Sequence, residues 1–360
     1  MKHFKERLAG AGVIRRTVGI KDVAQQAGVS VGTVSNVINR PETVARATRE
    51  RVQEVIARLG YVRSESARQL RAGASRIMGL LVLDMGNPFF VDVARGAERT
   101  ARAAGLGVMV CNSDSSPDEE AEYLSMFVEQ RVRGVLVTPA DATGRDLSLL
   151  RRHQIPYVVV DAVVEDGDGR GACSVSVDDV IGGEMAVAHL IDQGHRSIAF
   201  VSGLGHDRPQ IRDRWAGACR AVAAAGLPPE TMREISTDRL DVSPGADAVA
   251  SLLGLRKRPT AVFCANDMLA LGVLQALFAV GIKVPEEIAL VGYDDIEFAA
   301  AAAVPLTSVR QPAVEMGRLA AEMLVRETMA EEDAEEHVHE QIVLQPELAV
   351  RESSRRRLAP

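Results

Sequence analysis

Polar and aromatic side chains gather along residues 77–346 at points where short apolar runs end. Carboxylate, amide and guanidinium groups can form paired hydrogen bonds with ring hydroxyls, and an aromatic ring can stack on the apolar face of a sugar ring. The residues that offer these groups are Asn87, Phe89, Phe90, Asp161, Arg214, Asn266, Asp294 and Gln311. Their chemistry predicts a binding site for a sugar-like small molecule.

Several of these residues have a structural alternative. Asn266 and Asp267 are also placed to cap a helix over 269–281, and Asp294 and Asn87 suit turns or caps. From the sequence, both interpretations stay open.

The elements that must position these side chains follow from alternating patterns. β-branched runs and amphipathic stretches alternate over 77–84, 88–105, 107–114, 118–131, 135–139, 147–153 and 157–161. The alternation resumes over 174–178, 181–194, 198–203, 211–226, 232–237, 246–253, 261–265, 269–281 and 288–293, before a helix over 313–329 and a strand over 340–345. Runs that are apolar on both faces predict doubly wound parallel sheets, so we expect an α/β fold with two similar lobes. Ligands of such sheets bind beyond the carboxyl ends of the strands, where the polar residues lie.

Charge is distributed unevenly along the 360 residues, whose net charge is −7. Residues 1–76 contain 15 Lys and Arg but 6 Asp and Glu, which leaves 27 basic and 43 acidic residues for the rest. Neutralising phosphates supplies most of the non-specific affinity of proteins for nucleic acid. A basic segment on an acidic body therefore predicts a nucleic-acid-binding module, with a solvated basic tail as the alternative.

The basic segment has the pattern of a helix-turn-helix. Small and apolar residues from Ile20 onward predict a first helix, and a third helix over 48–59 closes the core. Gly28 suits a chain reversal, and Ser30 is placed to cap a second helix that runs to about Asn39. We expect the exposed N-terminal face of that second helix to contact base edges through Ser30, Val31, Gly32, Thr33, Ser35 and Asn36. An ordinary helical hairpin is the alternative.

This stretch resembles the DNA-binding headpiece and hinge helix of LacI/GalR-type bacterial repressors. The resemblance rests on Asp22-Val-Ala, Ala27-Gly-Val-Ser, Thr33-Val-Ser, Thr48-Arg-Glu-Arg-Val, Leu59-Gly-Tyr and Ala67-Arg-Gln-Leu, in the right order and spacing. It implies a homodimer whose hinge segments pair over the centre of a pseudo-palindromic operator in duplex DNA. Leu70 would enter the minor groove as an apolar wedge, with Ala67 beside it. Gly19 and Ala45 depart from the family, which usually has hydroxyl residues at these two helix starts.

The resemblance continues to about Pro346 and implies a two-lobed core like that of the periplasmic sugar receptors, which binds an effector between its lobes. By this resemblance Arg214 is a clamp arginine, Phe89 and Phe90 stack on a ring, and the other positions match in the same way. Those positions are Asp161, Asn266 in Ala-Asn-Asp, Asp294 in Gly-Tyr-Asp-Asp and Gln311 in Arg-Gln. Ala162 and Leu240 stand where many sugar binders have an arginine and an aromatic residue, so no particular sugar is predicted. A nucleoside or a protein co-regulator is the alternative effector.

The expected fold is therefore a three-helix helix-turn-helix headpiece joined to a two-lobed α/β core. The expected segments are a basic extension over 1–18, the headpiece over 19–62, the hinge helix and linker over 63–76, the core over 77–346 and a C-terminal tail over 347–360. The extension is either an arm that contacts phosphates or an artefact of a start codon placed upstream of Val18.

Other classes of function lack their motifs. Gly203-Leu-Gly205 lacks the third glycine of a dinucleotide fingerprint, and no P-loop, GxSxG or HExxH is present, so neither an enzyme nor a cofactor is expected. The apolar runs stop far short of the ~20 residues of a bilayer span, and no signal peptide is recognisable, which predicts a cytoplasmic location. An exported sugar receptor is the rival class, and the headpiece argues against it.

Two features bear on metals. His337-Val-His339 suggests a metal ligand pair, but it follows an acidic run and no further ligands are evident, so a solvated surface is favoured and no metal site is expected. The cysteines are single and sit in apolar segments, which predicts buried, reduced thiols at Cys111, Cys173, Cys219 and Cys264.

Overall fold

The computed structural model describes residues 18–61, 75–141, 145–163, 172–203, 208–333 and 338–355. The chain folds as two compact units, residues 1–73 and 74–360. Of the expected hinge segment, only Ser75 and Arg76 are among the described residues.

The first unit is a bundle of three helices. Its elements are α1 (Ile20–Ala27), α2 (Val31–Asn39), the 3-10 turn η1 (Pro41–Thr43) and α3 (Arg46–Leu59). Val23, Val34 and Val52, one from each helix, are fully buried at its centre. The predicted three-helix headpiece is confirmed.

The helix ends of this bundle include the two positions, Gly19 and Ala45, that depart from the family pattern. Gly28 ends α1 with φ of 63°, and Ser30 Oγ accepts a 3.0 Å hydrogen bond from the Thr33 amide to cap α2. Gly19 offers no cap to α1, but its own amide donates to Asp22 Oδ2 over 2.8 Å. Ala45 precedes α3 with no side-chain cap, a loss of about 1 kcal/mol.

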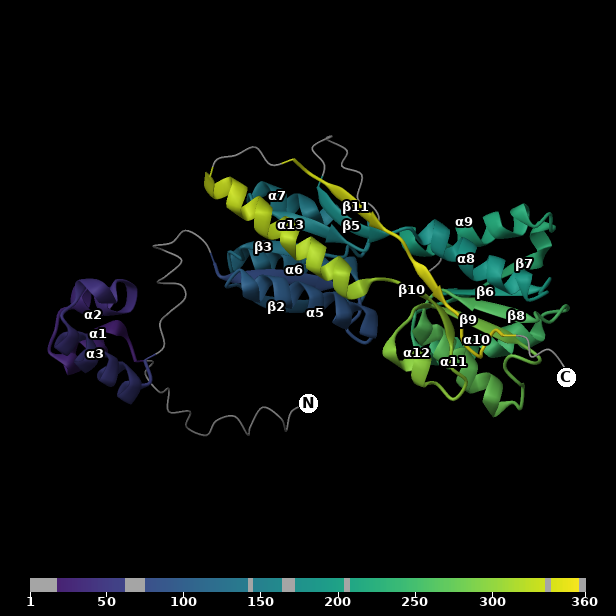
Figure 1. The fold of residues 1–360 in the computed structure, drawn as a ribbon, viewed down its shortest axis with the longest axis horizontal. Coiled ribbons are helices and arrows are strands. Elements are labelled where there is room, and N and C mark those ends of the chain that lie inside the picture. The colour runs from purple at the N-terminus through teal and green to yellow at the C-terminus, as the bar shows by residue number, and fades with distance from the viewer. Residues whose placement is uncertain are drawn as a thin grey trace, which may run out of the picture. The chain divides into compact units, whose positions relative to one another are not determined.

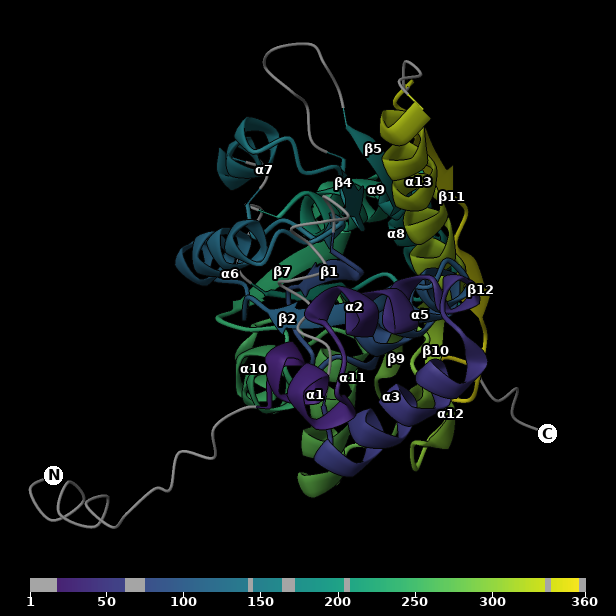
Figure 2. The same ribbon diagram turned by 90° about the vertical axis from the view of Figure 1, so that its left-hand side faces the viewer.

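The second unit contains two six-stranded sheets, one in each lobe (Figure 1). The first sheet has the order β11-β5-β4-β3-β1-β2 and is parallel throughout. Its strands are β1 (Ile77–Val82), β2 (Gly107–Asn112), β3 (Gly134–Val137), β4 (Tyr157–Val160), β5 (Cys173–Val177) and β11 (Gln341–Leu344). Helices α5 (Pro88–Ala103) and α13 (Ala313–Asp333) cover one face, while α6 (Pro117–Glu129), η2 (Arg145–Leu147) and α7 (Ser148–Arg152) cover the other (Figure 2).

The second lobe repeats this plan. Its sheet has the order β12-β10-β9-β8-β6-β7, with strands β6 (Ile198–Gly203), β7 (Met232–Thr237), β8 (Ala261–Cys264), β9 (Ala289–Asp294), β10 (Thr307–Arg310) and β12 (Glu347–Ala349). The helices are α8 (Asp179–Asp192) and α9 (Pro209–Ala224), α10 (Val242–Gly254) and α11 (Asp267–Ala279), with the short η4 (Pro229–Thr231) and α12 (Glu297–Ala301). The two predicted lobes of mostly parallel sheet are confirmed.

The chain crosses between the lobes three times. It leaves the first lobe after β5, returns after β10 to form α13, and leaves again between β11 and β12, where Figure 1 shows one extended segment running from lobe to lobe. Three separate segments of the chain therefore join the two lobes.

The C-terminal segment differs from the predicted tail. Strand β12 pairs antiparallel with β10, and neither strand was predicted. Ser353 is fully buried, and its backbone and hydroxyl bond to Leu290 and Thr307. A tail starting at residue 347 is therefore wrong for 347–355. Glu347–Ala349 has only three residues, which is too short to show a strand pattern.

The expectation that all four thiols are buried is wrong for one of them. Cys173 and Cys264 are buried and Cys111 is half-buried, but Cys219 is exposed. Cys219 follows the fully buried Ala218 on α9, and a step of 100° along the helix turns its side chain away from the packed face.

Candidate functional site

A cavity of about 320 Å³ lies between the two lobes, at the carboxyl ends of their strands. Residues of both lobes line it, and they include all eight that the sequence suggests for binding: Asn87, Phe89, Phe90, Asp161, Arg214, Asn266, Asp294 and Gln311. The first four belong to the first lobe, the next three to the second, and Gln311 lies on the crossing between β10 and α13. A molecule in this cavity would contact both lobes at once.

Asp294 is the point where the two lobes and a crossing segment meet. Its Oδ2 accepts a 2.9 Å hydrogen bond from Asn87 Nδ2, and its Oδ1 accepts a 2.8 Å hydrogen bond from Gln311 Nε2. Burial raises the pKa of Asp294 to about 6, although Arg214 and the two amides act in the opposite direction. Its φ of 105° is rare for a residue with a side chain. Strained backbone of this kind clusters at ligand sites.

Arg214, on α9, is held from three sides. Its Nε donates a 2.8 Å hydrogen bond to Asp179 Oδ1, and its Nη1 donates a 2.6 Å hydrogen bond to the Ala265 carbonyl. Its guanidinium carbon lies 3.7 Å from the centroid of the Tyr293 ring. Burial opposes its charge, but Asp179 and its other acidic neighbours outweigh burial and raise the pKa of Arg214. The guanidinium is therefore a fixed positive charge in the cavity wall.

Asp161 follows β4 and faces the second lobe. Its backbone carbonyl accepts a 2.5 Å hydrogen bond from Gln210 Nε2 on α9. Its φ of 60° lies in the left-handed region, as that of a non-glycine residue rarely does. Burial, reinforced by Asp179, raises the pKa of Asp161 well above its usual value. Within the described residues, Asp161 Oδ1 and Gln311 Oε1 are buried acceptors that receive no hydrogen bond. Such acceptors are costly unless a donor reaches them.

Asn266 and Asn87 are helix caps that also line the cavity. Asn266 Oδ1 caps α11 by accepting from the Leu269 amide over 2.9 Å, and Asn87 Oδ1 accepts from the Phe89 amide over 3.1 Å. Both residues line the cavity as well. Phe89 and Phe90 form an edge-to-face pair with ring centroids 5.0 Å apart.

The cavity lining also contains charged residues beyond the eight predicted from the sequence. Its lining holds six aspartates, Asp84, Asp114, Asp161, Asp238, Asp241 and Asp294, against three arginines, Arg208, Arg214 and Arg239. Asp84, Asp114 and Asp238 follow β1, β2 and β7, so the same strand-end rule would have found them. The predicted strands ran two residues too far at 84 and 114, which concealed the first two.

The rim of the cavity joins the lobes by a second, weaker contact. Arg239 Nη2 lies 3.3 Å from Asp114 Oδ1 of the first lobe and its Nε donates 2.8 Å to Asp241. These side chains are half exposed, so the ion pairs add little to stability.

The face of α2 differs in one residue from the predicted DNA-binding surface. Ser30, Val31, Gly32 and Asn36 are exposed and Thr33 is half-buried, but Ser35 is buried. The expectation that Ser35 lies on the exposed face is wrong, because it follows Val34 on the edge of the core and is covered by Asn39, whose Nδ2 donates to its carbonyl and hydroxyl over 2.7 and 3.2 Å. Ala67 and Leu70 lie outside the described residues.

Comparison with known proteins agrees with this architecture. Residues 19–64 match the family of bacterial regulatory proteins, lacI family, and residues 187–354 match a periplasmic binding protein-like domain. The HTH-type transcriptional repressor PurR of Aliivibrio fischeri (strain MJ11) is 37% identical over 347 residues, 94% of this chain and 99% of that protein. A LacI family regulator from Enterococcus faecium with bound ribose is 27% identical with a TM-score of 0.70, over 77% of this chain and 98% of that one. The lac repressor dimer bound to operator and the anti-inducer ONPF is 26% identical with a TM-score of 0.78, over 94% and 99%.

A helix-turn-helix unit and a two-lobed core with a cavity between the lobes define the class of ligand-binding transcription regulators. The chain belongs to the lacI family of bacterial regulatory proteins. In the described residues, no helix is long and apolar enough to cross a membrane.

Proposed function

We propose that the chain is a homodimeric transcriptional repressor whose affinity for a pseudo-palindromic operator is controlled by a small molecule in the cavity between the lobes. The observation that carries this proposal is the cavity itself, because its wall combines side chains of both lobes with Gln311 of a crossing segment. A ligand there favours one angle between the lobes over another.

The lining favours a neutral molecule rich in hydroxyl groups. The six aspartates outnumber the three arginines, so the wall disfavours phosphate or carboxylate groups on a ligand. The carboxylates can accept hydrogen bonds from ligand hydroxyls, and the guanidinium groups can donate to hydroxyl oxygens. Asp161 Oδ1 and Gln311 Oε1, which receive no donor within the described residues, would gain one from such a ligand. The ribose bound to the Enterococcus faecium regulator is a molecule of this class.

The proposed switch acts through the hinge segments over 63–76. A change in the angle between the lobes would alter the spacing of the paired hinges and so remove the contacts of Ala67 and Leu70 with the minor groove. A difference of about 1 to 3 kcal/mol in ligand affinity between the two arrangements is typical for coupled sites.

A thermal-shift screen on the full chain tests the ligand class. Neutral pentoses, hexoses and disaccharides form one arm, their phosphates a second and nucleosides a third. We expect a neutral sugar to raise the melting temperature and to change operator affinity in a gel-shift titration. Stabilisation by a phosphorylated sugar alone would overturn the ligand class, and stabilisation by nucleosides alone would replace the sugar with a nucleoside.

A further inference from the structure

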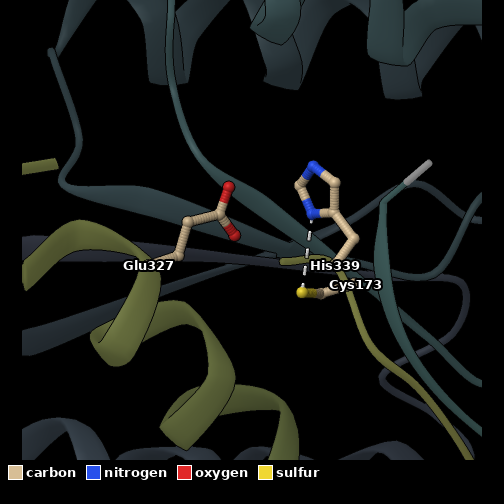
Figure 3. Close-up of side chains that lie close together, drawn as sticks. All are labelled: Cys173, Glu327 and His339. Carbon is tan, nitrogen blue, oxygen red and sulfur yellow. Dashed lines mark hydrogen bonds between the residues drawn. The ribbon is translucent and has the colours of Figure 1, made fainter. Parts of the chain in front are cut away.

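Three side chains with metal-binding chemistry meet at the edge of the first lobe, outside the cavity described above. Cys173 starts β5, Glu327 lies in α13, and His339 lies just before β11 (Figure 3). One donor atom from each of the three lies within 4.8 Å of the others. The chain brings them together from positions up to 166 residues apart.

The sheet register produces this meeting. Gln341 of β11 pairs with Ser174 of β5, and the Ser174 amide donates 3.0 Å to the Glu340 carbonyl. His339 is therefore held beside the start of β5, next to Cys173. Helix α13 packs over β5. In Figure 3 its Glu327 lies to one side of His339 and Cys173, with the carboxylate pointing toward them.

The donor set is one that Zn²⁺ prefers. A thiolate, an imidazole and a carboxylate bind this ion at about 2.3, 2.0 and 2.0–2.2 Å, so the sulfur and nitrogen of a tetrahedral site lie roughly 3.6 Å apart. Cys173 Sγ and His339 Nδ1 are 3.7 Å apart. The ligand atoms need to move little to close around an ion.

Burial and charge also suit a cation. Cys173 and Glu327 are buried whereas His339 is exposed, which leaves a route for an ion from solvent. Arg326, the neighbour of Glu327 on α13, is paired with Glu340 at 3.1 Å. A divalent ion would replace the thiol proton and balance the two negative ligands.

We propose that Cys173, Glu327 and His339 bind one Zn²⁺ ion per chain, with a water molecule in the fourth position. The ion ties α13 to the start of β5 and to the residue before β11, and so braces the crossing segment that runs from β11 to β12. The site does not depend on the identity of the effector in the cavity, and it holds whether or not the proposed repressor function does. The ordinary alternative is a weak thiol–imidazole hydrogen bond with no affinity for metal.

The experiment uses the full chain freed of metal with a chelator, then titrated with ZnCl₂ and, for a visible signal, with Co²⁺. We expect one equivalent of Zn²⁺ to bind and raise the melting temperature by several degrees, and Co²⁺ to give the charge-transfer band of a thiolate ligand. Cys173→Ser should abolish that band. Glu327→Gln and His339→Ala should each weaken Zn²⁺ binding by more than the roughly 10- to 100-fold that is lost when a residue hydrogen-bonded to a metal ligand is replaced.

Matched controls separate this site from other thiols and imidazoles. Cys219→Ser and His153→Ala remove an exposed cysteine and an exposed histidine elsewhere, and both should bind Zn²⁺ as the unaltered chain does. Because His339 is exposed, His339→Ala should keep the metal-free melting temperature, so its loss of binding would not reflect unfolding. The absence of a thiolate band, or equal Zn²⁺ affinity in Cys173→Ser and the unaltered chain, would overturn the proposal.

Discussion

Asn87 Nδ2 of the first lobe donates a 2.9 Å hydrogen bond to Asp294 Oδ2 of the second, across 207 positions of the chain. Both residues line the cavity, and Gln311 on a crossing segment bonds the other oxygen of the same carboxylate. The angle between the lobes is thus linked to the groups that would hold a ligand.

Replacing Asp294 tests this link. Asp294→Asn puts an amide where two amide donors converge, so we expect the ligand to lose its effect on operator affinity while operator binding persists. A gel-shift dose response measures both. Asp295→Asn is the matched control, because Asp295 is the next residue and its side chain is only 5% exposed, but it does not line the cavity. An unchanged dose response in Asp294→Asn would remove this residue from the site.

The raised pKa of Asp294 predicts that ligand binding depends on pH. A carboxylate accepts hydroxyl donors better than a carboxylic acid, so affinity should fall as the pH drops through about 6, to roughly one-tenth at pH 5. Isothermal titration between pH 5 and 7.5 gives the midpoint. Glu120→Gln is the control, since Glu120 is buried with a pKa of about 7 but lies outside the cavity lining. If Glu120→Gln shifted the midpoint of the pH dependence, Glu120 and not Asp294 would be the group that causes it.

The raised pKa of Asp294 affects folding stability in the opposite direction to ligand affinity. Because the pKa of Asp294 is raised from an ordinary 3.8 to about 6, its contribution to stability is complete below pH 3.8 and is lost as the pH rises through 6. Ligand affinity and this part of the ligand-free stability should therefore change in opposite directions over that range.

The buried pair of Arg214 and Asp179 predicts a large penalty when one partner is removed. Arg214→Met leaves the Asp179 carboxyl buried without its 2.8 Å partner, and we expect the core to lose about 3–5 kcal/mol. Arg214→Met with Asp179→Leu should lose clearly less than the sum of the single changes. Urea unfolding followed by the fluorescence of Trp215, the single tryptophan, measures this. Additive losses would show that the two side chains are not coupled.

Two adjacent residues of α2 should behave differently on DNA. Asn36 is exposed, so Asn36→Ala should cost about 1–3 kcal/mol on the operator and little on random duplex. Ser35 is buried against Asn39, so Ser35→Ala should instead lower headpiece stability by about 1 kcal/mol. Fluorescence anisotropy on both duplexes, with thermal melts, separates the two effects. A larger loss of specificity in Ser35→Ala would reverse the assignment.

The sequence could predict what depends on local rules. Asp161 and Asn266 were found because polar residues after parallel strands share one edge of a sheet. Asp179 follows β5 and begins α8, but its role depends on Arg214, which another helix supplies, so the sequence pattern did not single it out. Strand β12 was missed because three residues carry no pattern.

The cluster of Cys173, Glu327 and His339 was missed for a related reason. His339 was considered as a metal ligand, but its neighbours depend on the register of β11 on β5 and on the packing of α13. No local spacing encodes those contacts. Ser35 was misplaced because helical position alone does not show that Asn39 covers it.

The proposed repressor function is tested most directly by the affinity of the full chain for duplexes selected from a random pool, measured at moderate salt with and without the sugar found by the thermal screen. We expect the selected duplexes to be dyad-symmetric and the sugar to change the affinity by roughly 5- to 150-fold. Selected duplexes without dyad symmetry, bound equally well with and without the sugar, would contradict it.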